Sequence, residues 1–175
     1  INNELEFIKN SKNKIVAIGE VGLDFKETEE KEKQIQVFKK IIQLAQKINK
    51  PLIIHSRKAE AECISLLEEA KAKKVVMHCF SGKKSLLEKI KNNKWHISIP
   101  ANITFSEHFQ NAVKMFPIEQ LLCETDSPFL HPFKEENNEP ANVIESYKKI
   151  AEINGLSLNK VERFIENNFN KLFND

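Results

Sequence analysis

The stretch Pro51-Leu52-Ile53-Ile54-His55-Ser56-Arg57 decides the fold. Its first residue is a proline, a short apolar run follows, and the run ends in a histidine. Short apolar runs of this kind are typical of strands buried on both faces, as parallel strands are in α/β proteins. The chemistry of such folds lies at the carboxyl ends of the strands. Since imidazole can bind a metal or transfer a proton, His55 is a candidate site residue.

Three other apolar runs end in the same way, at Ile15–Glu20, Val75–His78 and Leu121–Asp126. Taken singly, each final residue has an ordinary structural explanation. A glutamate can cap the next helix, a histidine can be a hydrogen-bonded core residue, and an aspartate can form an Asx-turn. Together, one glutamate, two histidines and one aspartate at the same edge of a parallel sheet predict a metallohydrolase site.

Segments with helical periodicity separate the apolar runs. The clearest covers residues 31–49, where apolar side chains recur at spacings of three and four. Further patterns predict helices around residues 59–70, 86–90 and 109–116, a strand at 95–99, and two helices that begin near Pro140 and Ser157. This alternation of strands and helices favours parallel strands joined by right-handed crossovers.

The number of strands distinguishes between α/β architectures. A TIM (β/α)8 barrel needs about 250 residues and eight strands, whereas this chain has 175 residues and about five strand–helix units. We therefore predict an incomplete barrel whose first strands are absent. The alternative is an open sheet, but no glycine-rich phosphate loop follows the first strand. Because no linker or change of composition interrupts the chain, residues 1–175 are expected to form a single domain.

Composition sets limits on the function. The chain is 41% hydrophobic and 30% charged, as globular proteins are, and its net charge of +2 implies that any basic surface must be local. No apolar run approaches the length of a membrane helix and no signal peptide opens the chain, so we expect a cytoplasmic location and no membrane partner. Cys63, Cys79 and Cys123 lack CxxC spacing and are expected to be reduced thiols.

Five strings along the chain carry a family resemblance. They are Gly19–Phe25, Pro51–Arg57, Met77–Gly82, Glu124–Leu130 and Asn138–Ala141. With these strings, in this order, the chain resembles the TatD family of metal-dependent deoxyribonucleases. The resemblance implies a TIM barrel of the amidohydrolase type that binds up to two divalent cations, Mg, Mn or Zn. It also implies hydrolysis of phosphodiester bonds in DNA, in the manner of an exonuclease acting from a 3′ end.

The resemblance also implies roles for the residues at the strand ends. Glu20 would bridge both cations, His55 and His78 would complete one metal position, and Asp126 would ligate the other cation and act on the nucleophilic water. Asp24 is expected to support the site and not to bind a metal. The family opens with a His-x-His pair that this chain does not contain, so the amino-terminal portion with that pair is expected to be absent.

Candidate substrate contacts follow from position along the chain. Arg57 is placed to bind a phosphate, although a surface salt bridge is the alternative. Lys83 begins a helix on the expected active rim, and Asn102 follows the fourth strand run, where it is a candidate for backbone or base contacts. Lys71, Lys73 and Lys74 precede a strand, so we expect them on the opposite face, in contact with solvent only.

Three functions remain open. The first is a TatD-type nuclease acting on DNA. The second is a metal-dependent deacylase or esterase on the same scaffold, because the same cations activate water towards a carbonyl carbon. The third is a catalytically impaired chain that acts as a binding module. Unclosed barrel edges near Val16 and Leu122 also predict self-association.

Overall fold

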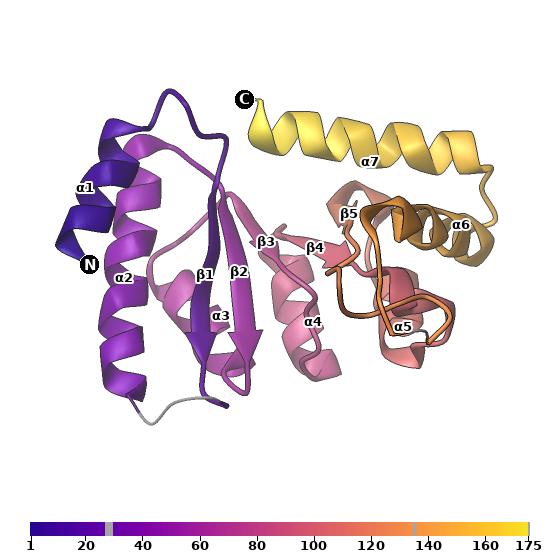
Figure 1. The fold of residues 1–175 in the computed structure, drawn as a ribbon, viewed down its shortest axis with the longest axis horizontal. Helices are drawn as coiled ribbons and strands as arrows, with labels where there is room; N and C mark the ends of the chain where they lie inside the picture. The colour runs from indigo at the N-terminus through magenta and orange to yellow at the C-terminus, as the bar shows by residue number, and fades with distance from the viewer. Residues whose placement is uncertain (27–29, 135, 175) are drawn as a thin grey trace. The chain divides into compact units, whose positions relative to one another are not determined.

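The computed structural model of the chain describes residues 1–26, 30–134 and 136–174 (Figure 1). The chain divides into two compact units, one of Ile1–Trp95 with Leu172–Asp175 and one of His96–Lys171. All five strands that the sequence predicts are present, three in the first unit and two in the second.

The first unit is built on three parallel strands, β1 (Ile18–Asp24), β2 (Leu52–Arg57) and β3 (Val75–Met77). β2 pairs with β1 on one side and with β3 on the other. Figure 1 shows the arrows of β1 and β2 side by side and pointing the same way. Because parallel strands run in one direction, their carboxyl ends lie at one edge of this sheet and their amino ends at the other.

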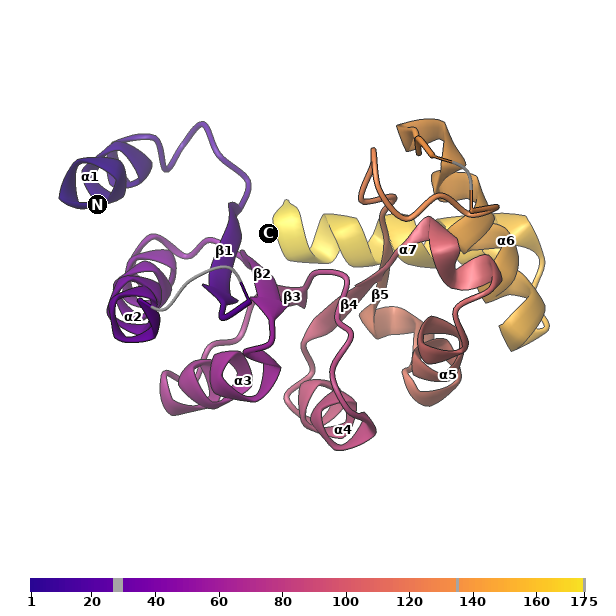
Figure 2. The same ribbon diagram turned by 60° about the horizontal axis from the view of Figure 1, so that its bottom comes forward.

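Helices cover one face of the three-stranded sheet. The helices of the first unit are α1 (Asn2–Asn10), α2 (Lys31–Ile48), α3 (Glu60–Glu69) and α4 (Lys84–Asn92). Figure 2 shows α2 and α3 on the same side of β1 and β2. α2 turns Phe38, Ile41, Ile42 and Ala45 into the core, as its periodicity predicts. α1 is not among the helices predicted from the sequence, although Ile1, Leu5 and Ile8 recur there at helical spacing, and it buries no residue.

The side chains of β2 alternate between the two faces of the sheet. Leu52, Ile54 and Ser56 are buried, whereas Ile53, His55 and Arg57 are partly exposed. Since successive residues of a strand point to opposite faces, His55 and Arg57 share the face opposite to Leu52 and Ile54. This alternation places His55 and Arg57 together, away from the packed face of β2.

The second unit contains two parallel strands, three α-helices and three short 3-10 helices. In chain order they are β4 (His96–Ile99), η1 (Ala101–Thr104), α5 (Glu107–Met115), η2 (Ile118–Gln120), β5 (Leu121–Cys123), η3 (Pro140–Asn142), α6 (Val143–Asn154) and α7 (Leu158–Phe173), whose last residues group with the first unit. β4 pairs with β5, with Ser98 opposite Leu122. The buried side chain of Asn168 ties α7 to β5, because its amide donates to the carbonyls of Ile118 and Leu121 at 2.7 and 2.8 Å.

Two further findings concern the cysteines and the lengths of the helices. All three cysteines are free thiols. Within the described residues, no helix combines the length and the apolar character that crossing a membrane requires.

Candidate metal centre

Glu20, His55 and His78 meet in the first unit, each from a different strand segment. Glu20 lies in β1, His55 in β2, and His78 directly follows β3. The Glu20 Oε2 atom is 3.9 Å from His55 Nδ1, and Glu20 Oε1 is 3.6 Å from His78 Nε2. One ligand atom from each residue lies within 4.8 Å of the others. We call these three residues the Glu20–His55–His78 cluster.

The donor set of this cluster fits a divalent cation. Two ligands bound to one zinc ion at about 2.1 Å can be at most about 4.2 Å apart. Both carboxylate–imidazole distances, 3.9 and 3.6 Å, fall below that limit. One carboxylate and two imidazoles also suit Zn, Mn and related ions without selecting one of them. The cluster is open to solvent on its Glu20 side, since the glutamate side chain is 50% exposed and that of His78 only 10%.

Glycines of β1 bring its backbone close enough to β2 to form the cluster. The pairing of β1 with β2 is irregular between Ile18 and Val21; it resumes at Val21 and places Gly22 opposite His55. Gly22 has a φ of +148°, and a Cβ atom there would collide with the carbonyl oxygen of His55. The strand extends to Asp24, so Glu20 lies inside β1 and not at its end as the apolar run 15–20 suggested. A side chain at position 22 would thus push β1 away from His55.

Asp24 links the cluster to Arg57. In the β1–β2 register Asp24 lies opposite Arg57, whose Nε and Nη2 atoms are 2.8 and 2.6 Å from Asp24 Oδ2. The same carboxylate oxygen is 3.4 Å from His55 Nε2. The Arg57 guanidinium lowers the pKa of Asp24 to about 2, although partial burial opposes this shift. Asp24 is therefore an anion that faces one nitrogen of His55, while Glu20 faces the other.

The contact between Asp24 and Arg57 was not predicted from the sequence. From sequence, Asp24 is expected to support the site, and Arg57 to bind a phosphate or to form a salt bridge with an unspecified partner. The missing information was the register of β1 against β2, which depends on the irregularity before Val21. A parallel alignment with Gly22 opposite His55 would have placed Asp24 opposite Arg57.

Asp126 belongs to the second unit, in the loop that follows β5. Its backbone is left-handed, with a φ of 57°, and its carbonyl accepts a hydrogen bond from Phe129 N at 2.9 Å. A non-glycine residue in this conformation is uncommon and is held by its surroundings. The loop is thus a defined turn, and its role as a second metal position remains a prediction.

Asn138 holds this loop in place. Its side-chain amide donates to the carbonyls of Thr125 and Phe129 at 2.8 and 2.6 Å, and its backbone N–H donates to the carbonyl of Pro128 at 2.9 Å. Its side-chain oxygen accepts hydrogen bonds from Glu139 N and Asn142 Nδ2, both at 2.9 Å. The sequence analysis used Asn138 only as part of a family string and did not find this role. The hydrogen bonds of Asn138 therefore hold the chain on both sides of Asp126, at Thr125 before it and at Phe129 after it.

The two other predicted substrate contacts lie in different units. Lys83 is exposed and immediately precedes α4 in the first unit, as predicted. Asn102 lies in η1 of the second unit, where its carbonyl accepts hydrogen bonds from Phe105 N and Ser106 N. The side-chain oxygen of Asn102 is buried and has no hydrogen-bond partner among the described residues. Such an acceptor can receive a hydrogen bond from a ligand.

The family model of TatD-related DNases matches residues 2–174. The chain belongs to the TatD-related DNase family. It is 41% identical over 174 residues to the human protein named deoxyribonuclease TATDN3, with 97% of this chain and 64% of that protein covered. It is 38% identical over 166 residues to the uncharacterized metal-dependent hydrolase MJ1582 of Methanocaldococcus jannaschii, with 95% of this chain and 66% of that protein covered. The chain thus spans less than two thirds of the length of either relative.

Solved structures of TatD proteins share the fold. A TatD-family hydrolase from Entamoeba histolytica has a TM-score of 0.86 and 27% identity, with 98% of this chain and 67% of that one covered. A TatD homologue from Escherichia coli, YJJV, has a TM-score of 0.89 and 24% identity, with 100% of this chain and 71% of that one covered. The predicted family and the predicted fold class are therefore confirmed.

Proposed function

We propose that this TatD-family chain is a divalent-metal-dependent hydrolase that cleaves phosphodiester bonds in DNA, in the manner of an exonuclease. The observation that carries the proposal is the meeting of Glu20, His55 and His78 within 4.8 Å. The family match and the name of the human relative support DNA as the substrate.

The residues of the cluster have distinct proposed roles. His55 and His78 donate one nitrogen each to a metal position. Glu20 has one carboxylate oxygen facing each histidine, which suits a ligand shared between two positions. Asp126 is proposed as a ligand of the second position and as the group that takes the proton from the attacking water. When bound, divalent cations lower the pKa of that water and stabilise charge on the phosphoryl oxygens. Mg, Mn and Zn all remain candidates.

Three residues are proposed to hold the substrate. Arg57 shares a face of β2 with His55, and Asp24 fixes its guanidinium beside that histidine. An arginine so oriented presents a planar fork that matches a phosphate. Lys83 is proposed to neutralise a second phosphate, and Asn102 to accept a hydrogen bond from a base through its unpaired buried oxygen.

An aromatic surface in the second unit favours a nucleic acid over a small ester. Phe105, Phe129 and Phe133 are 43%, 69% and 61% exposed. The Lys134 Nζ atom lies 4.7 Å from the centroid of the Phe105 ring. Phe129 and Phe133 belong to the loop that carries Asp126. Exposed rings beside a cation suit the stacking of unpaired bases, which is largely independent of sequence.

The test measures hydrolysis of labelled single-stranded DNA after removal of metal by EDTA. Adding back Mg, Mn or Zn is expected to release short products, and the metal that gives the highest rate identifies the cofactor. Glu20→Gln and His78→Ala should lower the rate at least about 100-fold. His108→Ala, a histidine substitution in α5 of the second unit, is the matched control and should change the rate less than about twofold.

Other outcomes would identify the competing functions. Hydrolysis of an aminoacyl ester without hydrolysis of DNA would establish the deacylase or esterase. Metal-dependent binding of DNA without hydrolysis under any metal would establish the binding module. Hydrolysis of DNA that persists in EDTA and in Glu20→Gln would contradict the proposed metal centre.

We further propose a cytoplasmic location and self-association through the outer edge of β1. The three free thiols suit a reducing compartment. Val16, next to β1, is 56% exposed, and an unpaired strand edge with apolar neighbours favours pairing with another chain. Analytical ultracentrifugation tests the second point: Val16→Lys should shift the chain towards the monomer, whereas a monomeric wild type would contradict it.

A further inference from the structure

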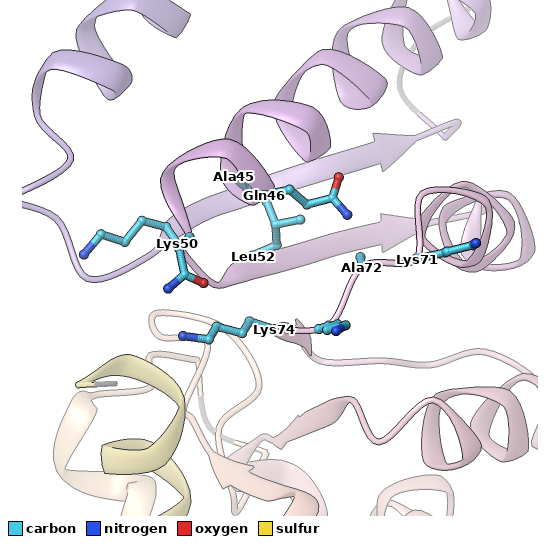
Figure 3. Close-up of a pocket in the computed structure, with 9 residues that line it drawn as sticks. Ala45, Gln46, Lys50, Leu52, Lys71, Ala72 and Lys74 are labelled. Atoms are coloured by element: carbon cyan, nitrogen blue, oxygen red, sulfur yellow. The ribbon is translucent and has the colours of Figure 1, made fainter.

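Two adjoining pockets lie at the amino ends of the strands of the first unit. The first, of about 220 Å³, is formed by the end of α2, the start of β2 and the segment before β3 (Figure 3). The second, of about 400 Å³, shares Asn49, Lys50 and Lys74 with it. We call the second pocket the lysine recess. It lies at the edge of the sheet that the amino ends of the strands form. Val16 precedes β1 by two residues, and Pro51 and Lys74 directly precede β2 and β3.

The charged residues that line these pockets are all basic within the part of the chain that the structure describes. Their lining includes five lysines, namely Lys12, Lys50, Lys71, Lys73 and Lys74. Among the described residues that line either pocket, none is an aspartate or a glutamate. The whole chain has 27 basic and 25 acidic residues, so this region departs from the average composition. Because the net charge of the chain is small, a basic surface on this protein has to be local, as the lining of these pockets is.

Lys50 and Lys74 line both pockets. The backbone N–H of Lys50 donates to the carbonyl of Ala45, and the carbonyl of Lys74 accepts from Leu52 N, both at 2.9 Å. Figure 3 shows the two lysine side chains extending in the same direction, whereas Lys71 points the other way. Both are partly buried, and neither forms an ion pair with a carboxylate of the described residues. Repulsion between like charges is stronger at partly buried positions than in bulk water, because partial burial lowers the effective dielectric constant.

Helix dipoles account for part of this arrangement only. Lys12 and Lys50 follow the carboxyl ends of α1 and α2, where a cation interacts favourably with the helix dipole. Lys74, however, directly precedes β3 and follows no helix end. The dipoles also give no reason for three lysines to line one recess. A bound anion explains both features.

We propose that the lysine recess binds a phosphate monoester of mononucleotide size. Lys12, Lys50 and Lys74 surround the phosphate with three positive charges, and the side-chain amides of Asn13 and Asn49 can donate hydrogen bonds to it. Three charges favour a dianionic monoester over the single charge of a phosphodiester link. The remaining wall includes Val16, Leu172 and Phe173, which offer an apolar surface to the organic part of the ligand. The volume of about 400 Å³ lies within the usual range for small-molecule sites.

The experiment is calorimetric titration of the chain with thymidine monophosphate, inorganic phosphate, thymidine and an oligothymidylate without terminal phosphates. EDTA removes metal ions, so that no ligand binds through the metal centre. Constant ionic strength keeps the screening of charges the same for every ligand. Saturable binding is expected for the two monophosphate probes and not for thymidine. The double variant Lys50→Gln/Lys74→Gln should weaken binding at least about tenfold.

Lys71→Gln/Lys73→Gln is the matched control, because it removes the same charge from the same region but outside the lysine recess. It should change the affinity less than about twofold. Melting temperatures show whether each variant is folded. Because the substitutions remove repulsion between lysines, Lys50→Gln/Lys74→Gln should be no less stable than the control. Equal weakening by both double variants, absence of saturable phosphate binding, or binding of the oligonucleotide but not of the monophosphates would overturn the proposal.

Discussion

Arg57 and Asp24 face each other across β1 and β2, with Arg57 Nη2 2.6 Å from Asp24 Oδ2. The same carboxylate oxygen lies 3.4 Å from His55 Nε2, so one aspartate orients both a candidate phosphate ligand and a candidate metal ligand. Carboxylates that hold a ligating histidine fix its ring and its tautomer. Because the pairing of β1 with β2 positions Asp24, that pairing also determines how His55 is oriented in the proposed metal centre.

Asp24→Asn should weaken metal binding by about 10- to 100-fold, because His55 loses the anion that orients its ring. The measurement is the dissociation constant for Mn or Zn, determined by calorimetry at pH 7.5. Glu68→Gln is the matched control, since Glu68 accepts a comparable hydrogen bond from Lys89 at 2.9 Å in the same unit but near the carboxyl end of α3. Equal metal affinity in wild type and Asp24→Asn would show that Asp24 does not position His55.

Gly22→Ala should destabilise the chain and disrupt the cluster. The added Cβ would collide with the carbonyl of His55, so that β1 must move away from β2. Overpacking of this kind costs about 1–3 kcal/mol, in addition to the strain of a positive φ. Gly155→Ala separates the two effects, because Gly155 also has a positive φ, of 62°, but its Cβ would meet nothing within 4 Å. Chemical denaturation should show a larger loss for Gly22→Ala, and only this variant should lose metal affinity.

The sequence predicted that Glu20, His55 and His78 would lie together, and their role as metal ligands stays a prediction, whereas the contacts around them were not predicted. Glu20, His55 and His78 could be found because each ends or closely follows an apolar run, and parallel strands bring such positions to one edge. The Asp24–Arg57 contact depends on an irregular register, which alternation of apolar and polar residues does not encode.

Hydrogen bonds between residues far apart in the sequence could not be predicted either. Asn138 contacts the carbonyl of Thr125 across 13 positions of the chain, through a loop whose backbone is not periodic. α1 was missed for a different reason, since its apolar stripe is short, with Leu5 and Ile8 as its last two members, and the helix buries no residue. Patterns therefore revealed what packs into the core, whereas contacts made by single polar side chains required the structure.

Tyr147 provides a pH-dependent test, because it is the one tyrosine of the chain. Burial raises the pKa of Tyr147 to about 12, above the ordinary tyrosine value of about 10. The unfolded chain would lose this proton near pH 10 while the folded chain keeps it, so the contribution to stability is complete below pH 10 and is lost as the pH rises towards 12. Absorbance at about 295 nm should titrate near pH 12 in the folded protein. In Tyr147→Phe the free energy of unfolding should fall less steeply between pH 10 and 12; the same slope in both proteins would contradict the assignment.

Asn138→Ala should loosen the loop that carries Asp126. The substitution leaves the carbonyls of Thr125 and Phe129 without their amide donor and removes the acceptor of Glu139 N, and each buried group left unpaired costs about 1–3 kcal/mol. Asn154→Ala is the control, since Asn154 makes one such bond, to the carbonyl of Ile150 at 2.9 Å in α6. We expect a loss of stability of about 2–4 kcal/mol for Asn138→Ala and about 1 kcal/mol for the control. Hydrogen exchange of the amide of Phe129, which donates to Asp126, should increase only in Asn138→Ala. Unchanged protection of that amide would mean that the turn at Asp126 holds its conformation without Asn138.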